Sequence, residues 1–223
     1  MVTRRAILAG LVLTACAPAP AGRHGLASRS VAVLTPAVAP SPTAPTTLPL
    51  SVPFGTPGRF VDYALQAERE RRLAEAIAAE RFRVRERFAA HLGAALEWRG
   101  IRPIVVPVAR FDPEFLTSLP AWEADALLDP VLEEYGFAGS TPEGPFIPFA
   151  VASIRILRRD GRSVMVERVA INVARPPSFT YIAGPDHPRF DRDVAFHRDT
   201  ARVTAGLDAA LRSLAGGIAA RLR

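Results

Sequence analysis

The chain of 223 residues contains no lysine and a single cysteine, Cys16. Because there is no second cysteine, an internal disulfide is excluded. The apolar run near the start, Ala6 to Leu13, is far shorter than the roughly 20 residues that span a bilayer. These absences exclude a disulfide framework and indicate that the apolar start is not a membrane-spanning helix.

Because the chain has no lysine, its positive charge comes from arginine alone. All 28 basic residues are arginine, and the formal net charge is +6. Four of these arginines precede residue 59, so 24 arginines stand against 22 acidic residues in the remainder, a balance of +2. Aromatic residues are not interleaved with the basic ones. We therefore expect no nucleic-acid partner.

Motifs for catalysis are missing as well. The sequence has no Gly-x-Ser-x-Gly elbow, no phosphate-binding loop and no Gly-x-Gly-x-x-Gly fingerprint. Asp125 and Asp129 are a candidate carboxylate pair for catalysis, but placement at an edge or a turn is the preferred interpretation. We expect neither an enzyme nor a bound cofactor.

Histidine is scarce, and its spacing fits no metal motif. The chain has four histidines, His24, His91, His187 and His197. The last two lie near three aspartates, Asp186, Asp191 and Asp193, but the spacing matches neither a His-Glu-x-x-His helix nor a calcium loop. Aspartates near the start of a helix are explained by capping and by the helix dipole. For His91, packing in the core or exposure at the surface is expected, and no metal site is predicted.

The N-terminus has the pattern of a secretory signal peptide. Thr3-Arg4-Arg5 is positively charged, an apolar run follows, and small residues precede the cysteine. The last four residues of this stretch, Leu13, Thr14, Ala15 and Cys16, resemble a bacterial lipobox. The resemblance implies that residues 1–15 are removed and that Cys16 carries covalent lipid. Two or more acyl chains hold a protein stably in a membrane, whereas one chain does not.

The leader also bears on location. Thr3 to Leu8 resembles a twin-arginine export signal, although paired arginines also occur in ordinary signals, so both export routes stay open. Position 17 is alanine and not the aspartate that favours retention in the inner membrane. The resemblance therefore implies an exported protein anchored in the cell envelope, facing the periplasm from the outer membrane rather than from the inner membrane.

After a flexible tether at residues 16–28, residues 29–223 are predicted to form a single α/β domain. The run Val31 to Leu34 indicates a buried strand, with a disordered linker as the alternative. Recurrent prolines in the excursion at residues 36–58 exclude a helix or a central strand from Pro36 to Pro57. Alternating apolar residues from Leu48 to Phe54 favour an edge segment along the domain.

Apolar periodicity predicts one long helix from Arg59 to Arg99, ended by Gly100. The prolines in 101–108 indicate an edge strand. Residues 124–136 have leucine spacing that suits a helix, but Pro130 favours a strand.

The remaining segments give a hairpin, a loop and a helix. Asp160-Gly161 predicts a two-residue turn between Phe149–Arg158 and Arg162–Val173. The turn sets a register that we predict to pair Ala150 with Ile171, Ala152 with Val169, Ile154 with Glu167 and Ile156 with Met165. A loop at 175–192 then precedes an amphipathic helix over about 193–222.

These elements predict an α+β two-layer sandwich. A small mixed sheet of about four or five strands is covered on one face by a long N-terminal helix and a C-terminal helix. The order from the strand at 29–34, through helix, Gly100 and strand, to Ala124–Leu128 resembles bacterial envelope lipoproteins of the α/β sandwich kind. That group includes the curli-secretion lipoprotein, penicillin-binding-protein activators and the amino-terminal domain of TolB.

Three functions agree with an anchor, a small domain and no catalytic motif. The first is a non-enzymatic adaptor or assembly factor for another envelope protein. The second is a homo-oligomeric export or scaffold lipoprotein. The third is a periplasmic binder of small molecules or lipids, with its pocket between the helix layer and the sheet. The oligomeric state is left open.

Overall fold

The computed structural model describes residues 29–47, 51–142, 144–173, 178–184 and 188–222. The predicted signal peptide, the lipidation site at Cys16 and the tether therefore lie outside the described residues. The elements, in chain order, are β1 Ser30–Leu34, β2 Ala37–Val38, α1 Ser51–Ala79, α2 Val84–Trp98, β3 Arg102–Val106, β4 Ala126–Gly139, β5 Phe146–Arg158, β6 Ser163–Ile171, β7 Phe179–Ile182, the short 3-10 helix η1 Asp193–Ala195, α3 Thr200–Ala219 and the short 3-10 helix η2 Ala220–Leu222.

The strands form one mixed sheet in the order β3-β1-β4-β5-β6-β7, and β2 pairs with β4 beyond the end of β1. Strands β4, β5 and β6 are antiparallel neighbours, and the other pairings are parallel. The predicted mixed sheet is confirmed, but the predicted number of strands is too low, because the described residues hold seven. The additional strands, β2 and β7, are only two and four residues long. The loop predicted at 175–192 is wrong over Phe179–Ile182, which form β7.

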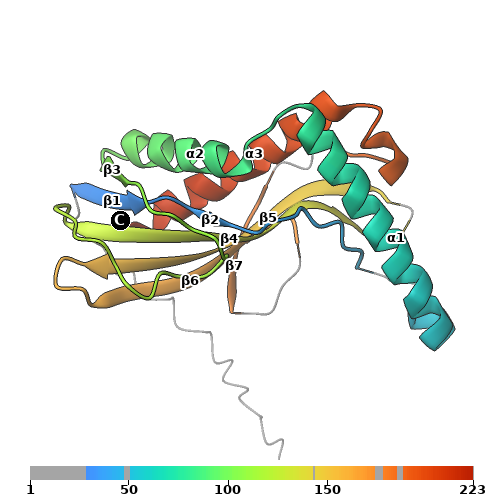
Figure 1. Cartoon of the computed structure of the whole chain (residues 1–223), viewed down its shortest axis with the longest axis horizontal. Coiled ribbons are helices and arrows are strands. Elements are labelled where there is room, and N and C mark those ends of the chain that lie inside the picture. Colours follow the sequence, from blue (N-terminus) through green and yellow to red (C-terminus); the bar gives the residue numbers. More distant parts are fainter. Residues whose placement is uncertain (1–28, 48–50, 143, 174–177, 185–187, 223) are drawn as a thin grey trace, which may run out of the picture.

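The helix layer consists of α2 and α3, which lie side by side on one face of the sheet (Figure 1). Their apolar side chains and those of the sheet form the main core, which includes Phe88, Leu92, Leu96, Leu211, Leu214, Ile218, Val31, Leu128, Ile154, Ile156 and Val169. The leucine and phenylalanine spacing of both helices agrees with this burial. The predicted C-terminal helix is thus confirmed, with its regular part starting at Thr200.

The predicted single helix over Arg59–Arg99 is wrong. The chain forms two helices, and Arg81 between them has a φ of 50°, a left-handed conformation that ends α1. The run from Glu80 to Arg83 has neither glycine nor proline, so the apolar and charged pattern continues across the break without a signal. Only α2 covers the sheet as predicted, and α1 runs away from it (Figure 1).

The expectation that Pro36 to Pro57 holds no helix or central strand is also wrong. Strand β2 pairs with the central strand β4, and α1 begins at Ser51. Pro53 is tolerated because it falls in the first turn, where a backbone N–H has no helical acceptor. Leu48 and Leu50, part of the predicted edge segment, lie outside the described residues.

The proline-rich segment after β2 nevertheless follows the sheet. Backbone hydrogen bonds join Ala39 to Leu132 and Thr43 to Tyr135, both at 2.9 Å between N and O. Pro130, in the interior of β4, lies opposite the interruption between β1 and β2, since Leu128 pairs with Val33 and Val131 pairs with Ala37. The strand predicted at 124–136 is therefore confirmed, and its proline lies where pairing is already broken.

One turn agrees closely with the sequence, and a second agrees in part. Gly100 has a φ of 74°, and its N–H donates to Glu97 O while Ile101 N–H donates to Leu96 O, which is the Schellman pattern. All four predicted β5–β6 pairs are confirmed. The two-residue turn is wrong, because Arg158 N–H donates to Arg162 O and the register shifts between Ile156 and Leu157. β3 lies at the edge of the sheet, as its prolines predict. No described helix is both long enough and apolar enough to cross a membrane.

Candidate functional site

The histidines and aspartates of the C-terminal region do not form a site in the described structure. His24, Asp186 and His187 lie outside the described residues, and His197 is exposed. His91 packs between α2 and α3, with its Nε2 2.9 Å from Asp208 Oδ1. In the ranges that the structure describes, no three ligating side chains are grouped as a metal site requires.

Asp125 and Asp129 have separate roles. Asp125 precedes β4 and accepts hydrogen bonds from the N–H groups of Arg29 and Ser30, both at 2.9 Å. The bonds from Ser30 hold the pKa of the Asp125 carboxyl below its usual value. Asp125 thus orders the start of β1 from a bend in the chain, in agreement with the expected placement at an edge or a turn.

For Asp129 the expected edge or turn position is wrong. It lies inside β4 and is fully buried, on the face of the sheet opposite the helices. Its Oδ1 accepts from Arg110 Nη1 at 2.6 Å, and its Oδ2 accepts from Arg155 Nη2 at 2.7 Å. The side chain of Arg110 is itself almost fully buried. A buried carboxylate is stable here because two guanidinium groups replace its water.

The same ionic group fixes the segment between β3 and β4. Leu116 N–H donates to Asp129 at 3.1 Å, and Leu116 O accepts from Arg155 at 2.6 Å. Arg110 donates to Glu114 O, and the guanidinium of Arg155 lies 5.0 Å from the ring centre of Phe115. The segment is therefore held against the open face of the sheet, opposite α2 and α3.

A cleft of about 720 Å³ lies beside this segment on the open face. Its sides include Pro113, Glu114, Phe115 and Ser178, and its floor comes from β4, β5 and β6. The floor residues are Val131, Glu133, Ser153, Val166 and Arg168, together with Glu167. The volume is in the range typical of small-molecule sites. The cleft lies on the face opposite the one where a pocket was expected from the sequence.

Three polar side chains meet on the floor of the cleft. Ser153 Oγ donates to Glu133 Oε1 at 2.5 Å, and Arg168 Nε lies 3.3 Å from both of these oxygens. The guanidinium of Arg168 is 5.4 Å from the ring centre of Phe179 in β7. Arg168 is thus oriented by one acid, one hydroxyl and one ring, while 54% of its side chain stays exposed.

This arrangement does not activate a nucleophile. Ser153 donates to a carboxylate that is already paired with arginine, and no histidine among the described residues contacts it. A serine nucleophile needs an oriented base and donors for the developing oxyanion. In this structure the hydroxyl of Ser153 is hydrogen-bonded to Glu133, and both groups contact Arg168 on the floor.

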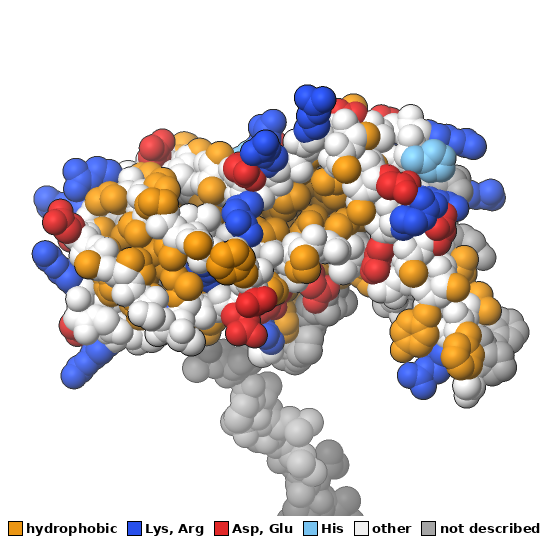
Figure 2. Space-filling model, viewed as in Figure 1, with side chains coloured by type: hydrophobic (Ala, Val, Ile, Leu, Met, Phe, Trp, Pro, Cys, Tyr) orange, Lys and Arg blue, Asp and Glu red, His pale blue; other side chains and the backbone are white. Residues whose placement is uncertain are grey.

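A second candidate surface is the projecting half of α1, residues 60–67. Phe60, Val61, Tyr63 and Leu65 are large apolar residues with exposed fractions of 72%, 47%, 64% and 41%. Figure 1 shows this end of α1 extending beyond the body of the domain, and Figure 2 shows apolar side chains gathered there, at the lower right. Contiguous exposed apolar surface is typical of an interaction site.

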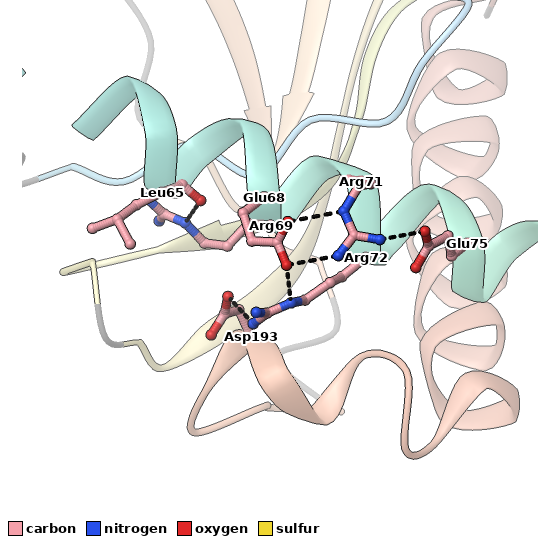
Figure 3. A network of polar contacts seen from close by, with 7 residues as sticks. All are labelled: Leu65, Glu68, Arg69, Arg71, Arg72, Glu75 and Asp193. Carbon is pink, nitrogen blue, oxygen red and sulfur yellow. Dashed lines mark hydrogen bonds and ion pairs between the residues drawn. The ribbon is translucent and has the colours of Figure 1, made fainter. Parts of the chain in front are cut away.

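The other half of α1 is firmly attached (Figure 3). Leu73 and Ala76 pack into a cluster with Phe137, Phe146 and Phe196. Arg72 Nη1 donates to Asp193 Oδ2 at 2.9 Å, which ties the helix to η1. This half therefore positions the projecting half relative to the domain.

Charged contacts along the helix reinforce the attached half. Glu68 accepts from Arg71 and Arg72, and the hydrogen bond from Arg71 lowers the pKa of Glu68 to about 2. Arg69 is buried and donates through Nε to Leu65 O at 2.9 Å, and burial lowers its pKa. The sequence predicts these charges as a solvated face, with a partner-binding or coiled-coil surface as the alternative. The burial of Arg69 departs from a solvated face.

Comparisons with known proteins add little. No family model matches the chain, and no curated protein matches it. Among solved structures, the chain is similar to protein XCC0632 from Xanthomonas campestris, described by family model DUF330. The sequence identity is 17%, the match covers 85% of this chain and 82% of that chain, and the TM-score is 0.37. A likeness of this strength indicates neither a shared fold nor a shared function.

Proposed function

We propose that this protein is a non-enzymatic lipoprotein of the bacterial envelope that acts as an adaptor for another protein. In this proposal, lipid on Cys16 holds the chain to the outer membrane, and residues 16–28 are the tether. The projecting half of α1 binds the partner. The observation that carries the proposal is the exposure of Phe60 and Tyr63 on a helix whose other half is fixed to the domain.

The chemistry of the surface favours a protein with an apolar groove as the partner. Phe60, Tyr63 and Ala67 are spaced by three and four residues, so they share one face of α1, and all three are exposed. An amphipathic helix that enters a groove has this spacing of anchors. A helical segment without tertiary packing is marginal in water, so a groove that covers it also stabilises it.

A membrane surface is a poorer match for this helix. Helices that lie in the interface carry many basic residues on their polar face. The stretch from Ser51 to Gln66 has one basic residue, Arg59, together with Asp62. Apolar contact alone would have to hold it there, without help from anionic lipids.

Site-specific crosslinking of the mature lipoprotein in intact cells tests the proposal. A photoreactive residue at Tyr63 is expected to give one crosslinked product with another envelope protein. The same probe at Phe111, which is 89% exposed but lies in the segment between β3 and β4, is the matched control and is expected to give none. Equal products from both positions would contradict the proposal.

Purification in mild detergent adds a second readout. The double substitution Phe60→Ser and Tyr63→Ser is expected to remove a stoichiometric partner, and Phe111→Ser to retain it. If the native mass shows an assembly of this chain alone, with crosslinks between identical chains at Tyr63, the scaffold alternative replaces the adaptor. If neither a partner nor an assembly is found, the adaptor proposal fails.

A further inference from the structure

The cleft on the open face of the sheet carries an ion pair that has unused hydrogen-bonding capacity among the residues that the structure describes. Glu133 uses only Oε1 for its contacts with Ser153 and Arg168. Among the described residues, none donates to its Oε2, and none accepts a hydrogen bond from Nη1 or Nη2 of Arg168. A negatively charged hydrogen-bond acceptor, Oε2 of Glu133, therefore lies close to two positively charged donors, Nη1 and Nη2 of Arg168.

The side chains around the pair define the rest of the site. Phe115, Val131 and Val166 also line the cleft, so the polar centre is bordered by apolar surface. Val166 is 62% exposed, which is unusual for a valine in the interior of a strand. A few oriented polar groups within an apolar lining are typical of small-molecule sites.

We propose that this cleft binds a small zwitterion of the α-amino acid class with an apolar side chain. The ligand carboxylate accepts two hydrogen bonds from the Nη groups of Arg168, in the bidentate geometry that guanidinium groups favour. The ligand ammonium donates to Oε2 of Glu133. The ligand side chain lies against Val131, Val166 and Phe115.

The spacing of the charges selects this class. Arg168 Nε and Glu133 Oε1 are 3.3 Å apart, so the free atoms of the two side chains are near neighbours. An α-amino acid carries its two charged groups on a single carbon, and both can be satisfied at once. A simple anion would meet the repulsion of Glu133 and of Glu114 and Glu167, which also line the cleft, and a simple cation would meet that of Arg168.

The orientation of Arg168 supports a built site rather than a chance surface pair. Ser153 is buried, Glu133 is partly buried, and the ring of Phe179 supports the guanidinium from β7. Less side-chain entropy is lost on binding when the group is already held in place. This inference is independent of the adaptor function, because the cleft and the projecting half of α1 share no residue.

Titration of the unmodified protein with three related probes tests the inference. L-Leucine carries both charges, N-acetyl-L-leucine lacks the ammonium, and L-leucinamide lacks the carboxylate. We expect leucine to bind with a dissociation constant of about 1 mM or below, followed by NMR chemical shifts, and each analogue to bind at least about tenfold more weakly. Equal binding of leucine and either analogue, or no binding of leucine at about 20 mM, would overturn the inference.

Variants locate the site. Arg168→Gln and Glu133→Gln are each expected to weaken leucine binding by about tenfold, with the fold verified by circular dichroism. Arg162→Gln, an exposed arginine beside the β5–β6 turn, is the matched control and is expected to leave binding unchanged. The double substitution at Phe60 and Tyr63 is also expected to leave it unchanged, so failure here and failure of the adaptor proposal are distinguishable.

Discussion

The two faces of the sheet are held together by different forces. On the helix face, α2 and α3 cover the strands through buried apolar side chains such as Phe88, Leu92 and Leu211. On the open face, the segment between β3 and β4 is held by the buried carboxylate of Asp129 between Arg110 and Arg155. The first arrangement depends on apolar area alone. The second adds these oriented charges to an apolar cluster, in which Leu116, Leu119 and Trp122 pack against the sheet.

This difference bears on function. Apolar burial is non-directional and grows with the area removed from water, so it suits a structural layer. Ionic contacts are directional, and removal of one partner leaves the others buried without compensation. The open face therefore holds the segment with Phe115 in a defined position beside the cleft, while the helix face buries the larger part of the core.

The largest expected loss of stability comes from removing the carboxylate of Asp129 on the open face. Asp129→Ala leaves Arg110 and Arg155 facing each other in a buried site, and we expect a loss of about 3–5 kcal/mol in the free energy of unfolding. Urea denaturation measures it. Asp112→Ala removes an exposed carboxylate from the same segment and is expected to change stability by less than about 0.5 kcal/mol. Similar values for the two variants would show that the Asp129 group does not hold the open face.

On the helix face, the expected loss of stability comes from a cavity in the core and not from an unpaired charge. Leu92→Ala in α2 is expected to lower the free energy of unfolding by about 2–5 kcal/mol, because Leu92 is fully buried against the sheet. Trp98→Ala on the same helix is the control, since its side chain is 81% exposed, and its expected effect is within about 0.5 kcal/mol. If Trp98→Ala cost as much as Leu92→Ala, the burial pattern of α2 would be wrong.

A smaller effect tests how the helix layer is joined to the sheet. Gly100 has a φ of 74° and no atom within 4 Å of an added Cβ, so Gly100→Ala costs only backbone strain, about 1 kcal/mol. Gly93 lies inside α2 with the same open space, and Gly93→Ala is expected to stabilise by about 0.5–1 kcal/mol. Thermal unfolding is expected to show a lower Tm for Gly100→Ala and a higher Tm for Gly93→Ala than for the unmodified protein. Effects of the same sign would contradict the turn geometry.

Local signals in the sequence explain which features could be predicted. The β5–β6 register is close to the one that Asp160-Gly161 predicts, but the turn is longer than two residues. A register shift between Ile156 and Leu157 restores the predicted pairs. Gly100 likewise marks the end of α2. The break after α1 gave no signal, since the residues from Glu80 to Arg83 continue the charged pattern and the left-handed residue is an arginine.

The ionic group and the cleft could not be predicted, because their members are distant in sequence. Asp129 is 19 residues from Arg110 and 26 residues from Arg155, and no periodicity connects them. An aspartate between a leucine and a proline has the same local pattern as a turn aspartate. The cleft depends on where the segment around Phe115 lies, and that position is set by the same long-range contacts. The open face thus required the three-dimensional structure, whereas the helix face followed from the apolar spacing.

The smallest expected effect on stability concerns Glu68, an exposed carboxylate that is paired with two arginines, as the buried Asp129 is. Glu68 on α1 is paired with Arg71 and Arg72, and its pKa is lowered from 4.5 to about 2, chiefly by the hydrogen bond from Arg71. A carboxyl with a lower pKa in the folded state stabilises the fold above its unfolded pKa, and this contribution is lost as the pH falls from about 4.5 towards 2. We expect Glu68→Gln to flatten the acid dependence of urea unfolding in this window, while stability at neutral pH changes little because the pair is exposed. Glu86→Gln, whose partner Arg83 is 3.6 Å away, is the control. If Glu68→Gln and the unmodified protein lost stability in parallel on acidification, the Glu68 pair on the outer surface of α1 would contribute nothing to the acid response.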